Sequence, residues 1–147
     1  MIQSKFDKIF YIFFFVSLLS ISIILISLWS INYSLFFGFA IGALVSYFNY
    51  ELSNFSVLLI LYKRKKSAIV FGILKHLFSL IIVGLVIYLI IYINLEHAKK
   101  INQKTIFFNK PINIFTFIFG ITLLPFSLLW SNGIYNYLKK KGKDGFI

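Results

Sequence analysis

Residues 9–50 read IFYIFFFVSLLSISIILISLWSINYSLFFGFAIGALVSYFNY and contain no Asp, Glu, Lys or Arg. A helix needs about 20 apolar residues to cross roughly 30 Å of hydrocarbon. The uncharged run is too long for one buried helix of a soluble protein, and the polar triplet Asn32-Tyr33-Ser34 interrupts it. The run therefore predicts two membrane-spanning helices joined by a tight turn.

The composition of the whole chain also indicates a membrane protein. Of its 147 residues, 60% are hydrophobic, 20% are aromatic and 13% are charged, and the mean hydropathy is +0.91. A soluble domain is nearer half apolar and a quarter charged, so these values exclude an ordinary soluble globule, and the apolar content excludes disorder. The chain has no cysteine, which excludes a disulfide and a thiolate metal site.

Four stretches are apolar enough and long enough to cross a membrane: residues 9–31, 35–62, 67–94 and 112–138. We therefore predict an all-α membrane protein with a single domain of four transmembrane helices. The first stretch is too long for the apolar part of a signal peptide and no small-residue cleavage motif follows it, so we expect it to be retained. Pro111 suits the first turn of the fourth helix, where its missing N–H is not needed.

The lysine and arginine residues predict the orientation of these helices. With both termini in the cytoplasm, ten of these residues fall inside and four fall outside, as the positive-inside rule requires. We expect the inner clusters to contact anionic lipid, and we expect no nucleic-acid binding because no soluble domain presents these charges. The residues assigned to topology and lipid contact are Lys63, Arg64, Lys65, Lys66, Lys139, Lys140 and Lys141.

At about 100° per residue, one side of the second predicted helix gathers small and polar residues. The stripe comprises Gly38, Gly42, Ser46, Asn49, Ser53 and Ser56. Small residues let two helix backbones approach closely, and an asparagine amide can form a hydrogen bond across the contact. The stripe therefore predicts a helix-packing seam, either inside the bundle or with a partner.

Three ionisable residues, Glu51, Lys75 and His76, lie inside the predicted spans. A charge in the hydrocarbon is costly unless it is paired, protonated or hydrated. At about 1.5 Å per residue, Glu51 lies roughly 16 Å and Lys75 roughly 12 Å from the cytoplasmic ends of their helices. We therefore expect an ion pair between Glu51 and Lys75, with His76 as the alternative partner. Such a pair is either a structural latch between two helices or part of an ion or proton site.

The ionisable residues do not form a recognisable enzyme site. The four acids are Asp7, Glu51, Glu96 and Asp144, and no two of them share a helix face. The two histidines stand far apart in the sequence, without a cysteine near either. No Ser-His-acid arrangement and no metal-ligand spacing appears. We therefore predict that the protein is not an enzyme and that it binds no cofactor or metal.

A family resemblance rests on the second and third predicted helices. Residues 38–49, GFAIGALVSYFN, followed by a basic connector and by GILK at residues 72–75, resemble ATP synthase protein I. That family has a glycine-rich second span with an asparagine at the offset of Asn49, and its third span opens with a glycine and then a basic residue. Some members have a proline in the last span, as at Pro125, and many have Arg in place of Lys75.

The resemblance implies a non-enzymatic accessory protein of the bacterial F-type ATP synthase, located in the plasma membrane. Members of the family help the ring of c subunits to insert and assemble, and a role in magnesium supply has been suggested for them. The implied partners are the membrane subunits of the synthase. Only Gly38, Gly42, Asn49 and Lys75 match positions of the family motif, and Glu51 is not a hallmark of the family.

Two other classes of function remain as alternatives. Glu51 inside the bilayer also suits a small ion channel or carrier, with Mg²⁺ as the candidate ion. One carboxylate is too few to strip water from Mg²⁺, so this alternative requires a homo-oligomer that places several Glu51 side chains on one axis. The third class is a structural subunit of a larger membrane complex, in which the pair of Glu51 and Lys75 only stabilises the fold.

Overall fold

The computed structural model describes residues 5–61, 65–101 and 110–140, which form helices joined by short segments. Four of these helices are long and apolar enough to cross a membrane. The described residues contain no strand. The chain is therefore an all-α protein with four helices of membrane-spanning length, as the sequence predicts.

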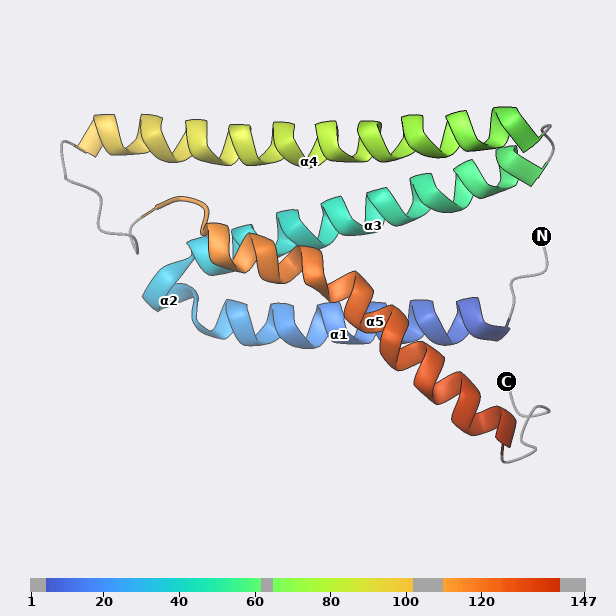
Figure 1. The fold of residues 1–147 in the computed structure, drawn as a ribbon. Helices are drawn as coiled ribbons and strands as arrows, with labels where there is room; N and C mark the ends of the chain where they lie inside the picture. Colours follow the sequence, from blue (N-terminus) through green and yellow to red (C-terminus); the bar gives the residue numbers. More distant parts are fainter. Residues whose placement is uncertain (1–4, 62–64, 102–109, 141–147) are drawn as a thin grey trace.

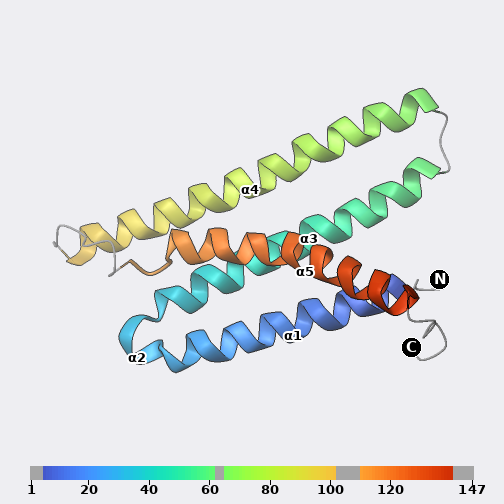
Figure 2. The ribbon, with the colours of Figure 1, turned by 60° about the horizontal axis from the view of Figure 1, so that its bottom comes forward.

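The helices are numbered α1 to α5 in chain order (Figure 1). Their bounds are Lys5–Ser27 for α1, Trp29–Asn32 for α2, Ser34–Leu61 for α3, Lys65–Ile101 for α4 and Ile114–Lys140 for α5. The short α2 forms the turn between α1 and α3. The four long helices alternate in direction, so α1 begins at the end of the bundle at which α5 ends (Figures 1 and 2).

The helix α3 is the centre of the bundle. It packs against α1, α4 and α5, and α5 also packs against α1. The helix α4 lies along α3, on the side away from α1 (Figures 1 and 2). Only 6% of the most apolar 18-residue stretch of α4 is buried, whereas 33% of the corresponding stretch of α3 is buried. The protein is therefore a three-helix unit of α1, α3 and α5, with α4 attached along one side.

Apolar side chains, several of them aromatic, fill the centre of the three-helix unit. This buried cluster comprises Phe10, Phe14, Phe39, Ala43, Leu123 and Leu124. A second buried cluster, of Ile90, Ile112 and Phe117, joins α4 to the start of α5. Because lipid is as apolar as these side chains, close packing between them stabilises the bundle more than their removal from lipid does.

The helices α1 and α4 differ most from their predicted spans. The helix α1 stops at Ser27, short of its predicted end, and α2 follows it. The helix α4 continues to Ile101 instead of ending at residue 94. An exposed ion pair joins Lys99 Nζ to Glu96 Oε1 at 2.8 Å in this extension, and residues three apart on a helix are neighbours on its surface. A polar sequence at this point therefore continues the helix beyond its apolar part.

Asparagine side chains organise the starts of α3 and α5. The Oδ1 of Asn113 accepts hydrogen bonds from the backbone N–H groups of Phe115, at 2.8 Å, and Thr116, at 3.2 Å. These bonds are the pattern of an N-terminal cap, which satisfies N–H groups that have no partner inside the helix. The Oδ1 of Asn32 accepts in the same way from the N–H of Ser34, at 3.0 Å, and from its hydroxyl, at 2.6 Å.

A third asparagine, Asn94, holds α4 against the segment before α5. Its Nδ2 donates to the carbonyl of Ile112 at 2.9 Å, and its Oδ1 accepts from the N–H of Ile112 at 3.1 Å. The N–H of Asn113 donates to the carbonyl of Ser34 at 3.2 Å. Helix α5 begins at Ile114, after this segment, so the prediction that Pro111 occupies the first turn of the fourth long helix is wrong.

Pro125 lies inside α5, and a proline in a helix interior removes one backbone hydrogen bond and displaces the preceding turn. The helix α5 changes direction near its middle in both views (Figures 1 and 2). The Oγ of the buried Ser127 donates to the carbonyl of Leu123 at 2.8 Å. Beyond the bend α5 contacts α1, where the ring of Trp130 stacks on that of Phe13 with a centroid distance of 6.3 Å.

Candidate functional site

The carboxylate of Glu51 faces α1, where a tyrosine binds it. The hydroxyl of Tyr11 donates a hydrogen bond to Glu51 Oε1 at 2.9 Å. Both residues are half-buried, and Tyr11 lies about one helical turn beyond Lys8 at the start of α1. The carboxylate is therefore held by a neutral donor from α1.

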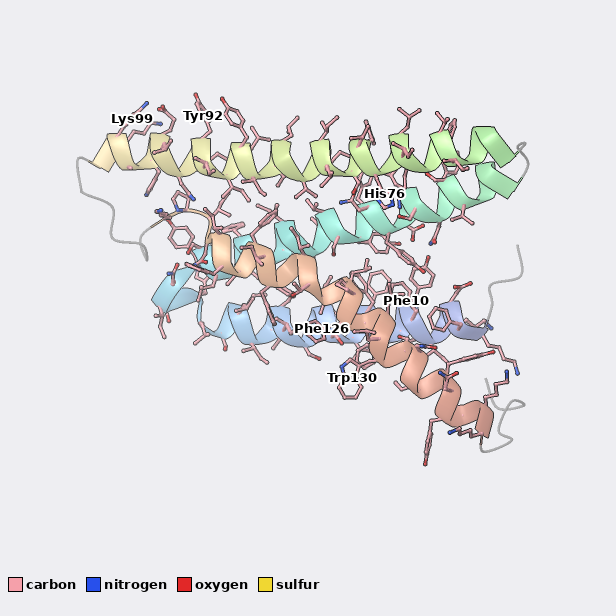
Figure 3. The ribbon with its side chains drawn as sticks, in the orientation of Figure 1. Phe10, His76, Tyr92, Lys99, Phe126 and Trp130 are labelled. Carbon is pink, nitrogen blue, oxygen red and sulfur yellow. The ribbon has the colours of Figure 1, made fainter. Side chains whose placement is uncertain are left out.

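Aromatic packing keeps the two partners of this hydrogen bond opposite each other. The ring of Tyr50 lies 4.6 Å from that of Phe10 and 6.4 Å from that of Tyr11, measured between centroids. The ring of Tyr47 stacks on that of Phe14 at 5.6 Å. Phe10 (labelled in Figure 3) and Phe14 belong to the buried core. These contacts set the rotation of α1 against α3 and so place the phenol beside the carboxylate.

The predicted ion pair between Glu51 and Lys75 is wrong. Both residues are described by the structure, and no ion pair or hydrogen bond joins them. Lys75 instead lines a groove between α3 and α4, next to Leu52 and Ser56. These two residues lie about 100° and 140° around α3 from Glu51. The antiparallel packing of α3 and α4 does place Lys75 at the level expected for it, but the carboxylate faces another side of α3.

The alternative partner, His76, does not bind the carboxylate either. It is exposed on the part of α4 that runs along α3 (Figure 3), and no hydrogen bond joins it to Glu51 in the described part of the chain. Residues 5–61, 65–101 and 110–140 contain no group of three or more His, Cys, Asp or Glu side chains that could hold a metal ion. The anionic and cationic positions therefore form two separate sites, one towards α1 and one towards α4.

The glycines of the small-residue stripe of α3 pack against α5. A Cβ atom at Gly42 would overlap the carbonyl of Phe117, and one at Gly38 would overlap the carbonyl of Asn113. A Cβ atom at Gly120 of α5 would in turn overlap the backbone of α3. The two backbones are in contact at this crossing, as small residues permit. The seam is internal, so α5 covers the surface that the sequence offered for a partner.

The polar residues of the stripe do not connect α3 to α5. The expected hydrogen bond between the side-chain amide of Asn49 and α5 is not formed among the described residues. Ser46 is buried, and its Oγ donates to the carbonyl of Ala43 in its own helix at 3.0 Å. The Oδ1 of Asn49 is buried and has no hydrogen-bond partner among the described residues. Close approach of the glycines therefore holds this crossing, without a hydrogen bond to the oxygen of Asn49.

The described basic residues of the predicted inner clusters gather at one end of the bundle, where α4 begins and α5 ends (Figure 1). They are Lys65, Lys66, Lys139 and Lys140. The last two are exposed. The other members, Lys63, Arg64 and Lys141, lie outside the described residues.

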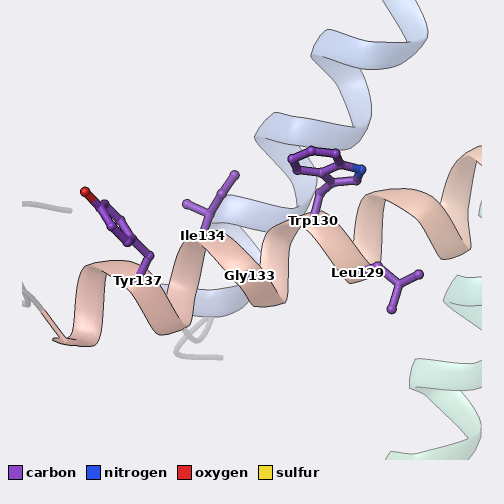
Figure 4. A pocket seen from close by; sticks show the side chains of 5 residues that line it. All are labelled: Leu129, Trp130, Gly133, Ile134 and Tyr137. Atoms are coloured by element: carbon purple, nitrogen blue, oxygen red, sulfur yellow. The ribbon is translucent and has the colours of Figure 1, made fainter.

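The second half of α5 carries a shallow apolar hollow of about 360 Å³ (Figure 4). It is lined by Leu129, Trp130, Gly133, Ile134 and Tyr137. The lining contains no carboxylate, imidazole or amine. Trp and Tyr side chains are typical of the interface between membrane and water, so we interpret this hollow as part of the lipid-facing surface.

No family model, curated protein or solved structure matches this chain. The resemblance to ATP synthase protein I therefore stays a prediction, which rests on residues 38–49, residues 72–75 and Pro125.

Two residues with clear roles in the structure were missed in the sequence. Tyr11 is the only hydroxyl-bearing residue in a run of apolar residues near the start of α1, and that hydroxyl is a signal that could have identified it as a donor for Glu51. Asn94 ends the apolar run of α4, where it appeared to be the start of a loop. Its buried amide, bonded to Ile112, shows that it instead joins two elements.

Proposed function

We propose that this protein is a non-enzymatic accessory protein that assists the assembly or stability of the c-ring of an F-type ATP synthase. It spans the bacterial plasma membrane with four helices and has both termini in the cytoplasm. The resemblance of residues 38–49 and 72–75 to ATP synthase protein I supports the class of function. The basic residues where α4 begins and α5 ends support the orientation.

One structural observation carries the proposal: α4 leaves most of its surface open. Only 6% of its most apolar 18-residue stretch is buried, and its exposed side chains are mainly aliphatic and aromatic. Gly84 lies in the middle of this surface, and a Cβ atom added there would meet nothing within 4 Å. Because glycine lets a second helix approach closely, we place the c-subunit contact at α4 around Gly84. The seam at Gly38 and Gly42 is covered by α5, so we do not propose it as the contact with the c subunit.

The test is recovery of synthase subunits with the affinity-tagged 147-residue chain from gently solubilised membranes. We expect the unchanged chain to recover the c subunit, and we expect Gly84→Leu to reduce recovery because its side chain blocks close approach. Gly133→Leu is the matched control, since Gly133 is also helical and open but lies on α5. If the unchanged chain recovers no synthase subunit, the proposal is refuted, and recovery of another membrane complex would favour a structural subunit of that complex.

A second candidate function is a small oligomeric ion or proton carrier, and the hydrogen bond between Tyr11 and Glu51 favours it. Tyr11 also lines an open hollow of about 480 Å³ with Lys8 and Tyr47, so the region of the carboxylate is open on one side. A single carboxylate cannot hold Mg²⁺ without further oxygen ligands, and Lys8 repels a cation at this hollow. Transport of Mg²⁺ would therefore require several copies of the chain.

Flux measurements in vesicles that contain the purified chain distinguish the two functions. A carrier that uses this site should show ion or proton flux that is lost in Glu51→Gln. The accessory protein should show no flux with either chain. Flux that is unchanged by Glu51→Gln would exclude the carboxylate as the transport site.

A further inference from the structure

We propose that the groove between α3 and α4 binds one acidic phospholipid, with Lys75 holding the phosphate of the headgroup. The groove has a volume of about 300 Å³. Its lining residues are Leu52, Ser56, Phe71, Leu74, Lys75, Phe78 and Ser79. The groove is separate from the Tyr11–Glu51 hydrogen bond and does not depend on the function proposed above.

Lys75 brings a positive charge without a counter-charge into this groove. In the part of the chain that the structure describes, its Nζ forms no ion pair and no hydrogen bond. Glu51, which neighbours Leu52 in sequence, already accepts a hydrogen bond from Tyr11 on another side of α3. A cation next to hydrocarbon is costly until an anion or water meets it, so we infer that the anion comes from outside the chain.

A second donor stands beside the lysine. Ser79 follows Lys75 by one turn on the same face of α4, where residues four apart are neighbours. Its hydroxyl forms no hydrogen bond within the described residues, whereas the hydroxyl of Ser56 donates to the carbonyl of Leu52 at 2.7 Å. A phosphate in the groove can therefore accept bonds from both an ammonium group and a free hydroxyl.

The rest of the lining suits an acyl chain. Leu52, Phe71, Leu74 and Phe78 are apolar, and Leu74 and Phe78 are exposed at the edge of the groove. The groove is therefore open sideways to the surrounding lipid. A ligand with an anionic head and a long apolar tail matches both parts of this lining.

The predicted span 67–94 places Lys75 inside the bilayer, but the uncharged part of α4 begins only after Lys75, so we place its side chain near the phospholipid headgroups. Residues 77–95 contain no charged residue and no histidine. At about 1.5 Å per residue this stretch spans about 28 Å, close to the thickness of the hydrocarbon core. Lys75 lies less than one turn before the stretch, and the long side chain of lysine extends its charge towards the headgroups. Basic pockets between transmembrane helices near the cytoplasm are typical sites for acidic headgroups.

The test uses the full chain in vesicles, with a tryptophan in the groove as the reporter. Trp29 and Trp130 are replaced by Phe, and Phe78→Trp is introduced. Phospholipids brominated on their acyl chains quench this fluorescence, so brominated phosphatidylglycerol is compared with brominated phosphatidylcholine. We expect phosphatidylglycerol to be favoured about fivefold, as for one basic residue close to a membrane surface.

Charge variants decide whether Lys75 causes the preference. Lys75→Gln should abolish it, and Lys75→Arg should keep it. Lys140→Gln is the matched control, because Lys140 is exposed at the same end of the bundle but lies on α5. Quenching by phosphatidylcholine should be equal in all variants, which shows that the groove is intact.

Three outcomes would overturn the proposal. The first is equal quenching by the two phospholipids in the chain with Lys75 present. The second is a preference that survives Lys75→Gln. The third is selective quenching by a brominated fatty acid and not by phosphatidylglycerol, which would assign the groove to a free carboxylate.

Discussion

Tyr11 differs from the phenylalanines around it by one hydroxyl group, and that group binds Glu51. An unpaired carboxylate inside a membrane is costly, and a neutral donor reduces this cost without adding a second charge. Glu51 faces α1 and not the groove that Lys75 lines, so the two residues do not pair. The anionic site and the cationic groove therefore lie on different sides of α3.

Tyr11→Phe should lower the free energy of unfolding by about 1–2 kcal/mol, because it removes a donor to a carboxylate and keeps the ring. Unfolding of the detergent-solubilised chain by heat or denaturant measures the effect. Tyr88→Phe is the control, since Tyr88 is exposed on α4. Equal losses in both variants would contradict the role of the hydroxyl.

A pair of double-mutant cycles should separate the observed partner of Glu51 from the predicted one. Tyr11→Phe combined with Glu51→Leu should show a coupling energy of about 1 kcal/mol, because the two side chains are in contact. Lys75→Gln combined with Glu51→Gln should show a coupling near zero, because no ion pair joins them. A large coupling in the second cycle would restore the latch predicted from the sequence.

The sequence predicted that Glu51 needs a partner, but it could not identify that partner. Depth along a helix follows from residue counting, and on this basis Lys75 was an acceptable candidate. The direction in which each side chain points depends on the rotation of α1, α3 and α4 about their axes. Side chains such as Phe10 and Phe39 set this rotation by packing, and an apolar sequence does not reveal which of many phenylalanines do so.

At the scale of the helices, glycines determine which two pack most closely. Gly38 and Gly42 of α3 and Gly120 of α5 bring two backbones into contact. The stripe on α3 was visible in the sequence because its residues repeat at helical spacing. Its partner on α5, formed by Thr116 and Gly120 at a spacing of four residues, was not recognised.

Gly42→Ala should destabilise the bundle by about 1–3 kcal/mol, the usual cost of overpacking, since its Cβ atom would meet the backbone of α5. Gly84→Ala should be neutral or slightly stabilising, because its Cβ atom would meet nothing within 4 Å and alanine favours helix. Thermal unfolding of the two variants side by side measures the difference. Tolerance of Gly42→Ala would argue against the close crossing of α3 and α5.

Asn94→Leu should destabilise the attachment of α4 by about 2–4 kcal/mol, because it leaves two buried backbone groups of Ile112 without partners. Asn136→Leu is the control, since Asn136 is exposed on α5. Hydrogen exchange of the N–H of Ile112 provides a local measurement. If hydrogen exchange of the Ile112 N–H is unchanged in Asn94→Leu, the side chain of Asn94 does not hold α4 against the segment before α5.

The ends of the helices were harder to predict than their existence. Hydropathy reports which residues suit hydrocarbon, and Asn94 marks the end of that stretch. It does not report where backbone hydrogen bonding stops, and α4 continues to Ile101 with the ion pair of Glu96 and Lys99 on its surface. The cap at Asn113 was likewise hidden, because Pro111 offered a competing and more familiar start signal.

At the scale of the whole molecule, the alternation of the four long helices places the start of α1 and the end of α5 at one end of the bundle (Figure 2). Four long helices that alternate in direction require this arrangement, and the four apolar stretches in the sequence predicted the number of long helices. The peripheral position of α4 was not predicted, although the most apolar stretch of α4, with a mean hydropathy of 2.6, is more apolar than those of α3, at 1.3, and α5, at 1.9.

The predicted orientation can be measured with single cysteines, because the chain contains none of its own. In intact cells, a membrane-impermeant maleimide should label Lys100→Cys. It should label Lys5→Cys and Lys140→Cys only after the membrane is disrupted, since the positive-inside rule places both in the cytoplasm. The reverse pattern would invert the orientation, and labelling of Lys5→Cys and Lys140→Cys from opposite sides would rule out an even number of crossings.

The contact between α3 and α5 also has a consequence for biosynthesis. The ribosome completes α3 well before α5, and the whole of α4 is made between them. During that interval α5 cannot cover the backbone at Gly38 and Gly42. We therefore expect the crossing of α3 and α5 to form only after the last of the four long helices has been made.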